Sequence, residues 1–255
     1  MSKPELVFAP VTLSEADGVR YLHLGSIWVQ GAMRIRKPHW VELDYVQRML
    51  ASLLWLPSAE LGQGHAVQLG LGAGAITRFT HKRLRMRTTA VELNPAVVDV
   101  CRHWFHVPAD DERLQVVTAD AGRWLRRNTP PQSVQLLHVD LYDHEAAAPV
   151  LDDGSFYADC RAALAGGGVM SVNLFGRDIS LQQSCARIAA VFGSDQVWTL
   201  RPTREGNTVV VAGRGVVVPG REELQARAAV IEDRFLADGL PARKWLRMVR
   251  PLALG

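Results

Sequence analysis

Three side chains that can move protons lie within four residues of one another in the stretch "HVDLYDHE". Asp140 and Asp143 flank Tyr142, and they follow an apolar run, "VQLLHV", that predicts a buried strand. Two carboxylates and a phenol at a strand end suit a cationic amine: the carboxylates orient the ammonium, and one accepts a proton as the amine becomes a nucleophile. We take all three as candidate catalytic residues. The alternative for Asp143 is that residues 143–145 form an exposed loop.

A glycine-rich turn, "VQLGLGAGAITRF", lies at residues 67–79. Gly70, Gly72 and Gly74 form the pattern G-x-G-x-G between an apolar run and a predicted helix. Glycine lets the backbone turn sharply and approach a ligand, and the N–H groups that open a helix favour a polar or anionic group. The turn, with Ala73 inside it, is therefore a candidate cofactor site. A turn that only packs the helix on the strand is the alternative.

Two acidic residues end the next two predicted strands. Glu92 ends "AVEL", where a carboxylate can accept from both ribose hydroxyls, or can be a solvated strand end. Asp120, followed by Ala121, ends "VVTADA", where it can accept from an adenine amine. In open α/β sheets, ligands bind in the crevice outside neighbouring strand ends. We therefore expect one adenosyl site that includes the glycine turn, Glu92, Asp120 and Ala121.

The spacing of the glycines excludes two common nucleotide motifs. A dinucleotide site would read G-x-G-x-x-G, and here the third glycine comes one residue early. The pattern G-x-x-x-x-G-K-[ST] is missing, so ATP hydrolysis would lack its lysine. The G-x-G-x-G spacing resembles that of class I S-adenosylmethionine-dependent transferases.

Strands and helices alternate from residue 66 onward. Predicted strands cover 66–71, 88–93, 114–119, 134–141 and 168–175, with helices at 74–82, 95–105, 120–127, 153–164 and 180–192. This alternation indicates an α/β, doubly wound parallel sheet. Strands at 196–202 and 207–214 are joined by "TREG", and so short a connection requires an antiparallel pair. The sheet should resemble the class I methyltransferase sheet, which ends in an antiparallel hairpin.

The two ends of the chain have other patterns. The stretches "ELVFAPVTL" and "VRYLHLGSIWVQGAMRI" flank the turn signal "SEADG" and predict a small antiparallel sheet. Val41, Tyr45, Met49 and Leu53 have helical spacing. We expect an N-terminal β-rich region with a closing helix (1–58), a methyltransferase-like nucleoside-binding domain (59–215), and a C-terminal amphipathic helix and tail (216–255).

Composition limits the other functions. Nearly half of the 255 residues are hydrophobic and the formal net charge is +3, so the basic runs "HKRLRMR" and "RWLRR" are predicted to be exposed faces, not a nucleic-acid stripe. Three cysteines without C-x-x-C, with no signal peptide or membrane-length apolar stretch, favour a cytoplasmic protein with no membrane partner. His103 and His106 lack a third ligand nearby, so no metal is predicted. His138 is expected in the core.

The chain resembles the spermidine synthase family, the polyamine aminopropyltransferases, over about residues 20–213. The resemblance rests on "VQGAMR", the glycine turn, "VELNP", "DLYD" and "NTVVVA". It implies transfer of an aminopropyl group from decarboxylated S-adenosylmethionine to a diamine, by a homodimer. By position, it implies that Gln30 and Gln47 contact the thioether nucleoside, with Glu92 at the ribose and Asp120 at the adenine. Asp140 is then the general base.

The sequence departs from the family on the amine side. The family's glycine turn usually reads G-G-G-D-G, and Ala73 stands in place of that aspartate. The Y-H-E or Y-Q-E segment corresponds to "VQR" at 46–48, and D-S-[ST]-D-P has become "DLYDH". Two alternatives therefore stay open: a small-molecule methyltransferase that uses ordinary S-adenosylmethionine, which the loss of a charge at Ala73 favours, and a non-catalytic nucleoside-binding relative. The motif "DLYD" argues against nucleic-acid substrates.

Overall fold

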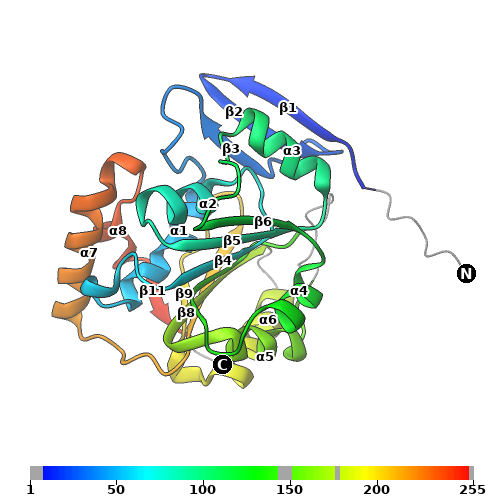
Figure 1. The fold of residues 1–255 in the computed structure, drawn as a ribbon. Coiled ribbons are helices and arrows are strands. Elements are labelled where there is room, and N and C mark those ends of the chain that lie inside the picture. The colour runs from blue at the N-terminus through cyan, green and yellow to red at the C-terminus, as the bar shows by residue number, and fades with distance from the viewer. Residues whose placement is uncertain (1–7, 143–150, 176–178, 253–255) are drawn as a thin grey trace, which may run out of the picture.

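The computed structural model describes residues 8–142, 151–175 and 179–252, and an eight-stranded sheet is its main element (Figure 1). The order across the sheet is β11-β9-β10-β8-β7-β4-β5-β6. The strands are β4 (His65–Leu69), β5 (Arg87–Glu92), β6 (Leu114–Thr118), β7 (Val134–Val139), β8 (Leu164–Phe175), β9 (Val197–Leu200), β10 (Asn207–Gly213) and β11 (Val249–Pro251). Strands β6, β5, β4, β7 and β8 are parallel, whereas β10, β9 and β11 each pair antiparallel. The predicted α/β class, including the antiparallel pair β9–β10, is confirmed.

Helices cover both faces of this sheet. They are α1 (Asp44–Met49), η1 (Leu50–Trp55), η2 (Ser58–Glu60), α2 (Ala75–Arg78), η3 (Phe79–Arg83), α3 (Pro95–Trp104), α4 (Ala121–Asn128), α5 (Gly154–Ala163), α6 (Ile179–Phe192), η4 (Ser194–Gln196), α7 (Arg221–Phe235), η5 (Leu236–Asp238) and α8 (Ala242–Trp245). On one face, Trp124 of α4, Phe156 of α5 and Ile188 of α6 are buried in one cluster. On the other face, Leu53 of η1 and Ile231 of α7 share a second cluster. The sheet is therefore doubly wound.

Two predicted helices are shorter or more irregular than the spacing indicated. The helix expected at 74–82 is α2 followed by η3, a π-helical turn in which the Leu84 N–H donates to the Phe79 carbonyl at 3.0 Å. In the N-terminal helix, Met49 and Leu53 are fully buried as their spacing predicts, but the helix is α only over α1 and 3-10 over η1. Half-buried Tyr45, on the same line, instead reaches the cavity described below.

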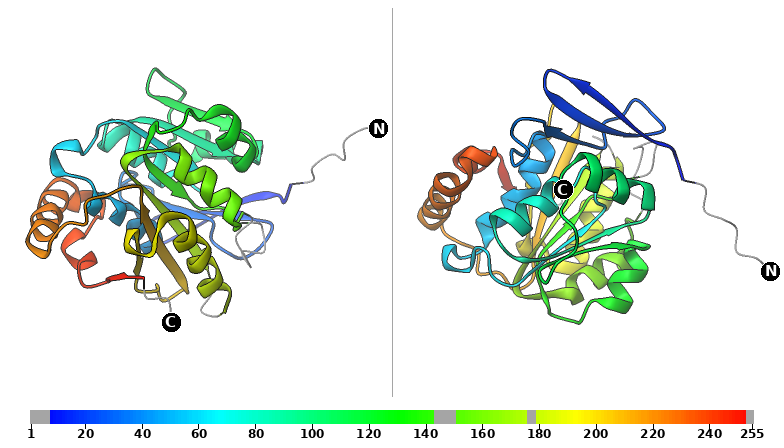
Figure 2. Two further views of the ribbon diagram at one scale, coloured as in Figure 1. Left: turned by 90° about the horizontal axis from the view of Figure 1, so that it is seen from below. Right: turned by 45° about the horizontal axis from the view of Figure 1, so that its top comes forward.

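The C-terminal region adds a strand that the sequence pattern did not predict. After α7 and α8 the chain returns as β11, which pairs with β9 at the edge of the sheet. Three residues that include Pro251 are too few to form a strand pattern, and proline is tolerated at a sheet edge. In Figures 1 and 2, α7 lies beside η1, with which it shares the cluster around Leu53. The division at 58 and 215 stays a prediction.

The N-terminal residues form a separate antiparallel sheet of β1 (Val11–Ala16), β2 (Val19–Leu24) and β3 (Gly31–Arg34), as predicted (Figure 1). Leu22 and Met33 of this sheet are fully buried against Val97 and Phe105, on and just after α3. This packing places the connection between β2 and β3 above the carboxyl ends of the parallel strands. The N-terminal sheet therefore supplies one wall of the site.

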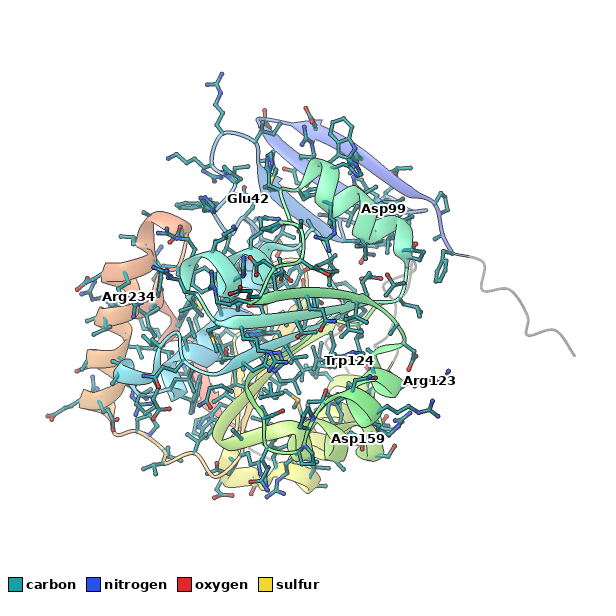
Figure 3. All side chains as sticks on the ribbon, in the orientation of Figure 1. Glu42, Asp99, Arg123, Trp124, Asp159 and Arg234 are labelled. Carbon is teal, nitrogen blue, oxygen red and sulfur yellow. The ribbon has the colours of Figure 1, made fainter. Side chains whose placement is uncertain are left out.

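The two basic runs lie mostly on the surface. Arg123 projects outward from α4 (Figure 3), and Arg126 and Arg127 are also exposed, as predicted. The prediction is wrong for His81, which is fully buried with its Nε2 atom 3.1 Å from the Asp111 carboxylate. The reason is that the π-helical turn η3 directs this residue inward.

Candidate active site

Side chains donate hydrogen bonds to the first four carbonyls of the glycine turn between β4 and α2, those of residues 70–73. The Gln68 amide donates to the carbonyls of Gly70 (2.7 Å) and Leu71 (3.2 Å). The Cys101 thiol donates to Gly72 (3.0 Å) and the Arg78 guanidinium to Ala73 (2.6 Å). Burial lowers the pKa of Arg78 to about 10, which leaves it charged at neutral pH. The turn is therefore rigid before any ligand binds.

Gly70 meets a steric requirement that other residues cannot meet. Its φ is +85°, and a Cβ atom there would lie 2.1 Å from the carbonyl oxygen of Asp140. The Asp140 N–H in turn donates to the Leu69 carbonyl at 2.9 Å. Because Gly70 has no side chain, the glycine turn can pack against the backbone of Asp140, the candidate base.

Ala73 and Gly74 lie outside the cavity that the turn lines. The Ala73 methyl group is buried against the Cα of Gly31, where a Cβ would come within 2.5 Å of it. Gly74 faces Val107. Of the turn's candidate residues, only Gly70 and Gly72 line the cavity. The Ala73 side chain therefore packs β3 on the turn.

Glu92 joins the ends of two strands. One carboxylate oxygen accepts from the Leu71 N–H (2.9 Å) and the other from the Asn94 N–H (2.9 Å). Burial raises the pKa of Glu92, and the two backbone hydrogen bonds oppose that rise. Glu92 lines the cavity, and each of its oxygens keeps a further lone pair, so the carboxylate has the capacity to accept from two neighbouring hydroxyls.

Asp120 and Ala121 lie at the start of α4 and line the same cavity. One Asp120 oxygen caps the helix by accepting from the Arg123 N–H at 2.7 Å. The residue is exposed, so its other oxygen is open to a ligand. The structure therefore brings together Gly70, Gly72, Glu92 and Asp120, the expected nucleoside-binding set.

A cavity of about 670 Å³ lies over these strand ends. Its remaining walls come from the ends of β7 and β8, the turn before β10, the β2–β3 connection and the segment that begins α1. Gln30 lines it, and its contact with a thioether nucleoside stays a prediction. Gln47 does not, because its amide donates to the Val41 carbonyl at 2.8 Å. A cavity of this size is typical of a small-molecule site.

Asp140 lies beside the glycine turn with both oxygens hydrogen-bonded. Tyr45 donates its hydroxyl to one oxygen at 3.2 Å, and the Asn173 amide donates to the other at 2.9 Å. Burial raises the pKa of Asp140, the two hydrogen bonds lower it, and the nearby Glu92 charge raises it. A positioned carboxylate with a raised pKa has the chemistry of a general base.

Tyr142 lines the cavity next to this carboxylate. Its hydroxyl donates to the Asn173 carbonyl at 2.9 Å, and burial followed by the Asp140 charge raises its pKa. Tyr142 therefore stays a neutral phenol. Asp143 lies outside the described residues.

The charge of the cavity is strongly one-sided. Among the described residues it is lined by six carboxylates and by no lysine, arginine or histidine; the six are Glu42, Asp44, Glu92, Asp120, Asp140 and Glu205. Figure 3 shows Glu42 beside the N-terminal sheet. Arginines outside the lining pair with two of the six, Arg34 with Glu42 (2.6 Å) and Arg48 with Asp44 (2.6 Å). Such a lining favours a cationic ligand.

Several site residues were not found from the sequence. Helical spacing predicts Tyr45 only for a buried helix face, and Asn173, Gln68 and Arg78 lie in ranges predicted as strands or a helix. Tyr45 directly precedes the segment 46–48 that corresponds to the family's Y-H-E or Y-Q-E motif. A search of the neighbouring positions for a phenol would have found it.

Other candidate features remain outside the site. His138 is fully buried with its Nδ1 atom 2.8 Å from the Ser171 hydroxyl, as expected for a core residue. His103 lies on the surface with its Nδ1 atom 2.7 Å from the Asp99 carbonyl. Within the described ranges there is no cluster of three potential metal ligands, and no helix long and apolar enough to span a bilayer.

Comparison with known proteins identifies relatives of this chain. No protein-family model matches the chain. The polyamine aminopropyltransferase of Neisseria meningitidis serogroup A is 32% identical over 209 residues, or 80% of this chain and 76% of that protein. The enzyme of the same name from Chromobacterium violaceum is 31% identical over 227 residues, or 88% of this chain and 84% of that protein.

Two solved structures share the fold. A probable spermidine synthase from Corynebacterium glutamicum superposes with a TM-score of 0.71 at 18% identity, covering 96% of this chain and 94% of that one. Human methyltransferase-like protein 13 in complex with SAH gives a TM-score of 0.62 at 22% identity, covering 83% and 96%. With the sequence identity, the sheet order and the glycine turn, these findings show that the chain belongs to the polyamine aminopropyltransferase family, on a class I methyltransferase-like fold.

Proposed function

We propose that the protein transfers an aminopropyl group from decarboxylated S-adenosylmethionine to a polyamine-type amine. The observation that carries the proposal is the cavity itself: a rigid glycine turn and Glu92 at one side, Asp140 at the other, and a lining of carboxylates without a cationic side chain among the described residues. Both substrates are cations, so the lining attracts both of them.

The nucleoside half of the donor fits the strand ends of β4, β5 and β6. Glu92 accepts from the two ribose hydroxyls, and the free oxygen of Asp120 accepts from the adenine amine. Gly70 and Gly72 let the backbone approach the thioether. These roles use only groups that already line the cavity and still have acceptor capacity.

Asp140 acts on the acceptor. It takes a proton from the ammonium, which leaves a neutral nitrogen that attacks the methylene carbon next to the sulfonium. A C–N bond forms, the C–S bond breaks, and its electron pair stays on sulfur to give a neutral thioether nucleoside. Asp140 then releases its proton to solvent. The protein contributes positioning and the base, because the sulfonium is already an activated leaving group.

The decarboxylated donor is favoured over ordinary S-adenosylmethionine by the position of Ala73. The missing aspartate could have made room for the amino-acid carboxylate, but the Ala73 methyl group packs on Gly31 and opens no space in the cavity. A donor carboxylate would instead add a further negative charge to a cavity that is already lined by carboxylates. Like charges in one site are destabilising.

The test is an assay of the purified protein with each donor and a set of amines, with products identified by mass spectrometry. An amine that gains an aminopropyl group, and tighter calorimetric binding of the decarboxylated donor, would support the proposal. Methyl transfer from ordinary S-adenosylmethionine would replace it with the methyltransferase alternative. Nucleoside binding without turnover on any amine would indicate a non-catalytic relative.

Glu92→Gln is expected to weaken binding of the donor about 10- to 100-fold. The amide cannot accept at both positions, so it loses one charge-assisted hydrogen bond, a change on the order of 1.5–3 kcal/mol. The dissociation constant of S-adenosylhomocysteine, measured by calorimetry, checks this. The control is Glu112→Gln, an exposed carboxylate outside the cavity lining. Equal affinities for the Glu92 variant and the wild type would contradict the ribose assignment.

Tyr45→Phe is expected to move the acid limb of the pH–kcat profile to higher pH. The Tyr45 hydroxyl lowers the pKa of Asp140, so its removal raises that pKa, and the carboxylate is protonated at a higher pH than in the wild type. The comparison variant is Tyr142→Phe. It also removes a phenol hydroxyl from the cavity, but that hydroxyl donates to the Asn173 carbonyl and not to Asp140. The same displacement of the limb in both variants would argue against Asp140 as the titrating base.

We also propose a cytoplasmic homodimer, as the family resemblance implied. The N-terminal strands and the half-exposed Trp28 are the candidate contacts. Light scattering coupled to size-exclusion chromatography measures the mass directly, and a monomer at micromolar concentration would contradict the dimer.

A further inference from the structure

The turn between β9 and β10 brings one more carboxylate, Glu205, to the cavity. The Thr203 N–H donates to the Asn207 carbonyl (2.8 Å), and the Asn207 N–H donates to the Thr203 hydroxyl (3.1 Å). The Asn207 amide then donates to the Asn173 side chain (3.1 Å), which itself donates to Asp140 (2.9 Å). Two amide side chains therefore connect the Glu205 turn to the candidate base and separate the two carboxylates.

Glu205 differs from the other five carboxylates of the lining. Glu42 and Asp44 pair with arginines, Glu92 and Asp120 accept from backbone N–H groups, and Asp140 accepts from Tyr45 and Asn173. Glu205 is exposed, and in the part of the chain that the structure describes it has no hydrogen-bond or ion-pair partner. Its charge is therefore available to a ligand.

The wall next to Glu205 is apolar. Phe175 lies beside Gly206, where a Cβ would be 3.5 Å from the phenyl ring. Trp28, from the β2–β3 connection, packs edge-on against Phe175 with ring centroids 6.3 Å apart, and both rings line the cavity. Methylene groups can pack on such a wall while charged ends reach carboxylates.

We propose that Glu205 binds a second ammonium group of the acceptor, while the reacting nitrogen lies at Asp140 and the methylene chain crosses the wall of Trp28 and Phe175. This inference rests on the proposed function and assigns a specificity residue to it: Glu205 selects an acceptor that carries two ammonium groups over a monoamine. The turn between β9 and β10 thereby supplies a carboxylate to an amine side that lacks the aspartate at position 73.

The experiment compares Glu205→Gln with the wild type on a linear diamine and on the monoamine of equal chain length. The variant keeps the side-chain shape and removes only the charge. We expect the KM of the diamine to rise about fivefold, the upper range for a solvent-exposed ion pair, with kcat and the KM of the monoamine unchanged. Because added salt screens exposed charges, it should raise the KM of the diamine more in the wild type than in the variant.

Glu112→Gln, which removes an exposed carboxylate outside the lining, is the matched control and should leave both KM values unchanged. An unchanged KM for the diamine in Glu205→Gln, or an equal rise for both amines, would overturn the role of Glu205 while leaving aminopropyl transfer intact. A wild type that transfers aminopropyl to no amine would instead refute the proposed function, and this inference would fall with it.

Discussion

Asp140→Asn is expected to lower kcat by a factor of about 10²–10⁴ and to raise the melting temperature. The loss of rate is the usual contribution of a general base. The asparagine can keep both native contacts, because its oxygen can accept from the Asn173 amide and its own amide can donate to the Tyr45 hydroxyl. Binding of the donor should therefore change little, and the effect should be confined to kcat.

The gain in stability follows from the direction of the pKa shift. Burial raises the pKa of Asp140 in the folded state, so between the unfolded and folded pKa values the folded protein binds more protons. Stability therefore falls as pH rises through that window, and at neutral pH the buried charge is destabilising. Removing the charge should stabilise the fold at pH 7 and have little effect at a pH below both values.

Steady-state kinetics and thermal unfolding at two pH values check this prediction. Glu205→Gln is the matched control, since it also removes a carboxylate from the cavity but is expected to change KM alone. A wild-type kcat in Asp140→Asn would show that another group, or solvent, accepts the proton. A lower melting temperature at neutral pH would show that the carboxylate has a structural role.

Gly70→Ala is expected to destabilise the protein by about 2–5 kcal/mol and to abolish measurable turnover. A positive φ costs about 1–2 kcal/mol for a residue with a Cβ atom, and overpacking adds about 1–3 kcal/mol. The new methyl group would meet the Asp140 carbonyl, 2.1 Å from the ideal Cβ position. Either the turn or the end of β7 must move, so the nucleoside site and the base lose their relative positions together.

Gly154→Ala is the matched control, because no atom lies within 4 Å of its ideal Cβ position and its residue begins α5. Alanine favours a helix over glycine by about 0.5–1 kcal/mol, so this variant should be neutral or slightly more stable. Chemical denaturation and the transfer assay measure both variants. Native stability and activity in Gly70→Ala would contradict the close approach of the turn to Asp140.

The local pattern of hydrophobic and turn residues in the sequence determined the order of strands and helices and those site residues that lie at strand ends. Alternating strand and helix signals require a parallel sheet, and the carboxyl ends of neighbouring parallel strands meet at one edge. Gly70, Glu92, Asp120 and Asp140 each follow directly from a strand end, so their convergence could be predicted without coordinates. The antiparallel β9–β10 pair followed from a connection too short for a crossover.

Tertiary packing decided the rest, because it depends on contacts between segments far apart in the sequence. Tyr45 reaches Asp140 across 95 positions, and the β9–β10 turn reaches the cavity through Asn207 and Asn173. Ala73 and Gln47 occupy positions that correspond to family site residues, but Ala73 packs against Gly31 and the Gln47 amide donates to the Val41 carbonyl. The residues at the carboxyl ends of neighbouring parallel strands meet at one edge of the sheet, and the strand pattern in the sequence predicts that. The orientation of a side chain on a loop or a short helix depends instead on the packing space and the hydrogen-bond partners that distant segments supply.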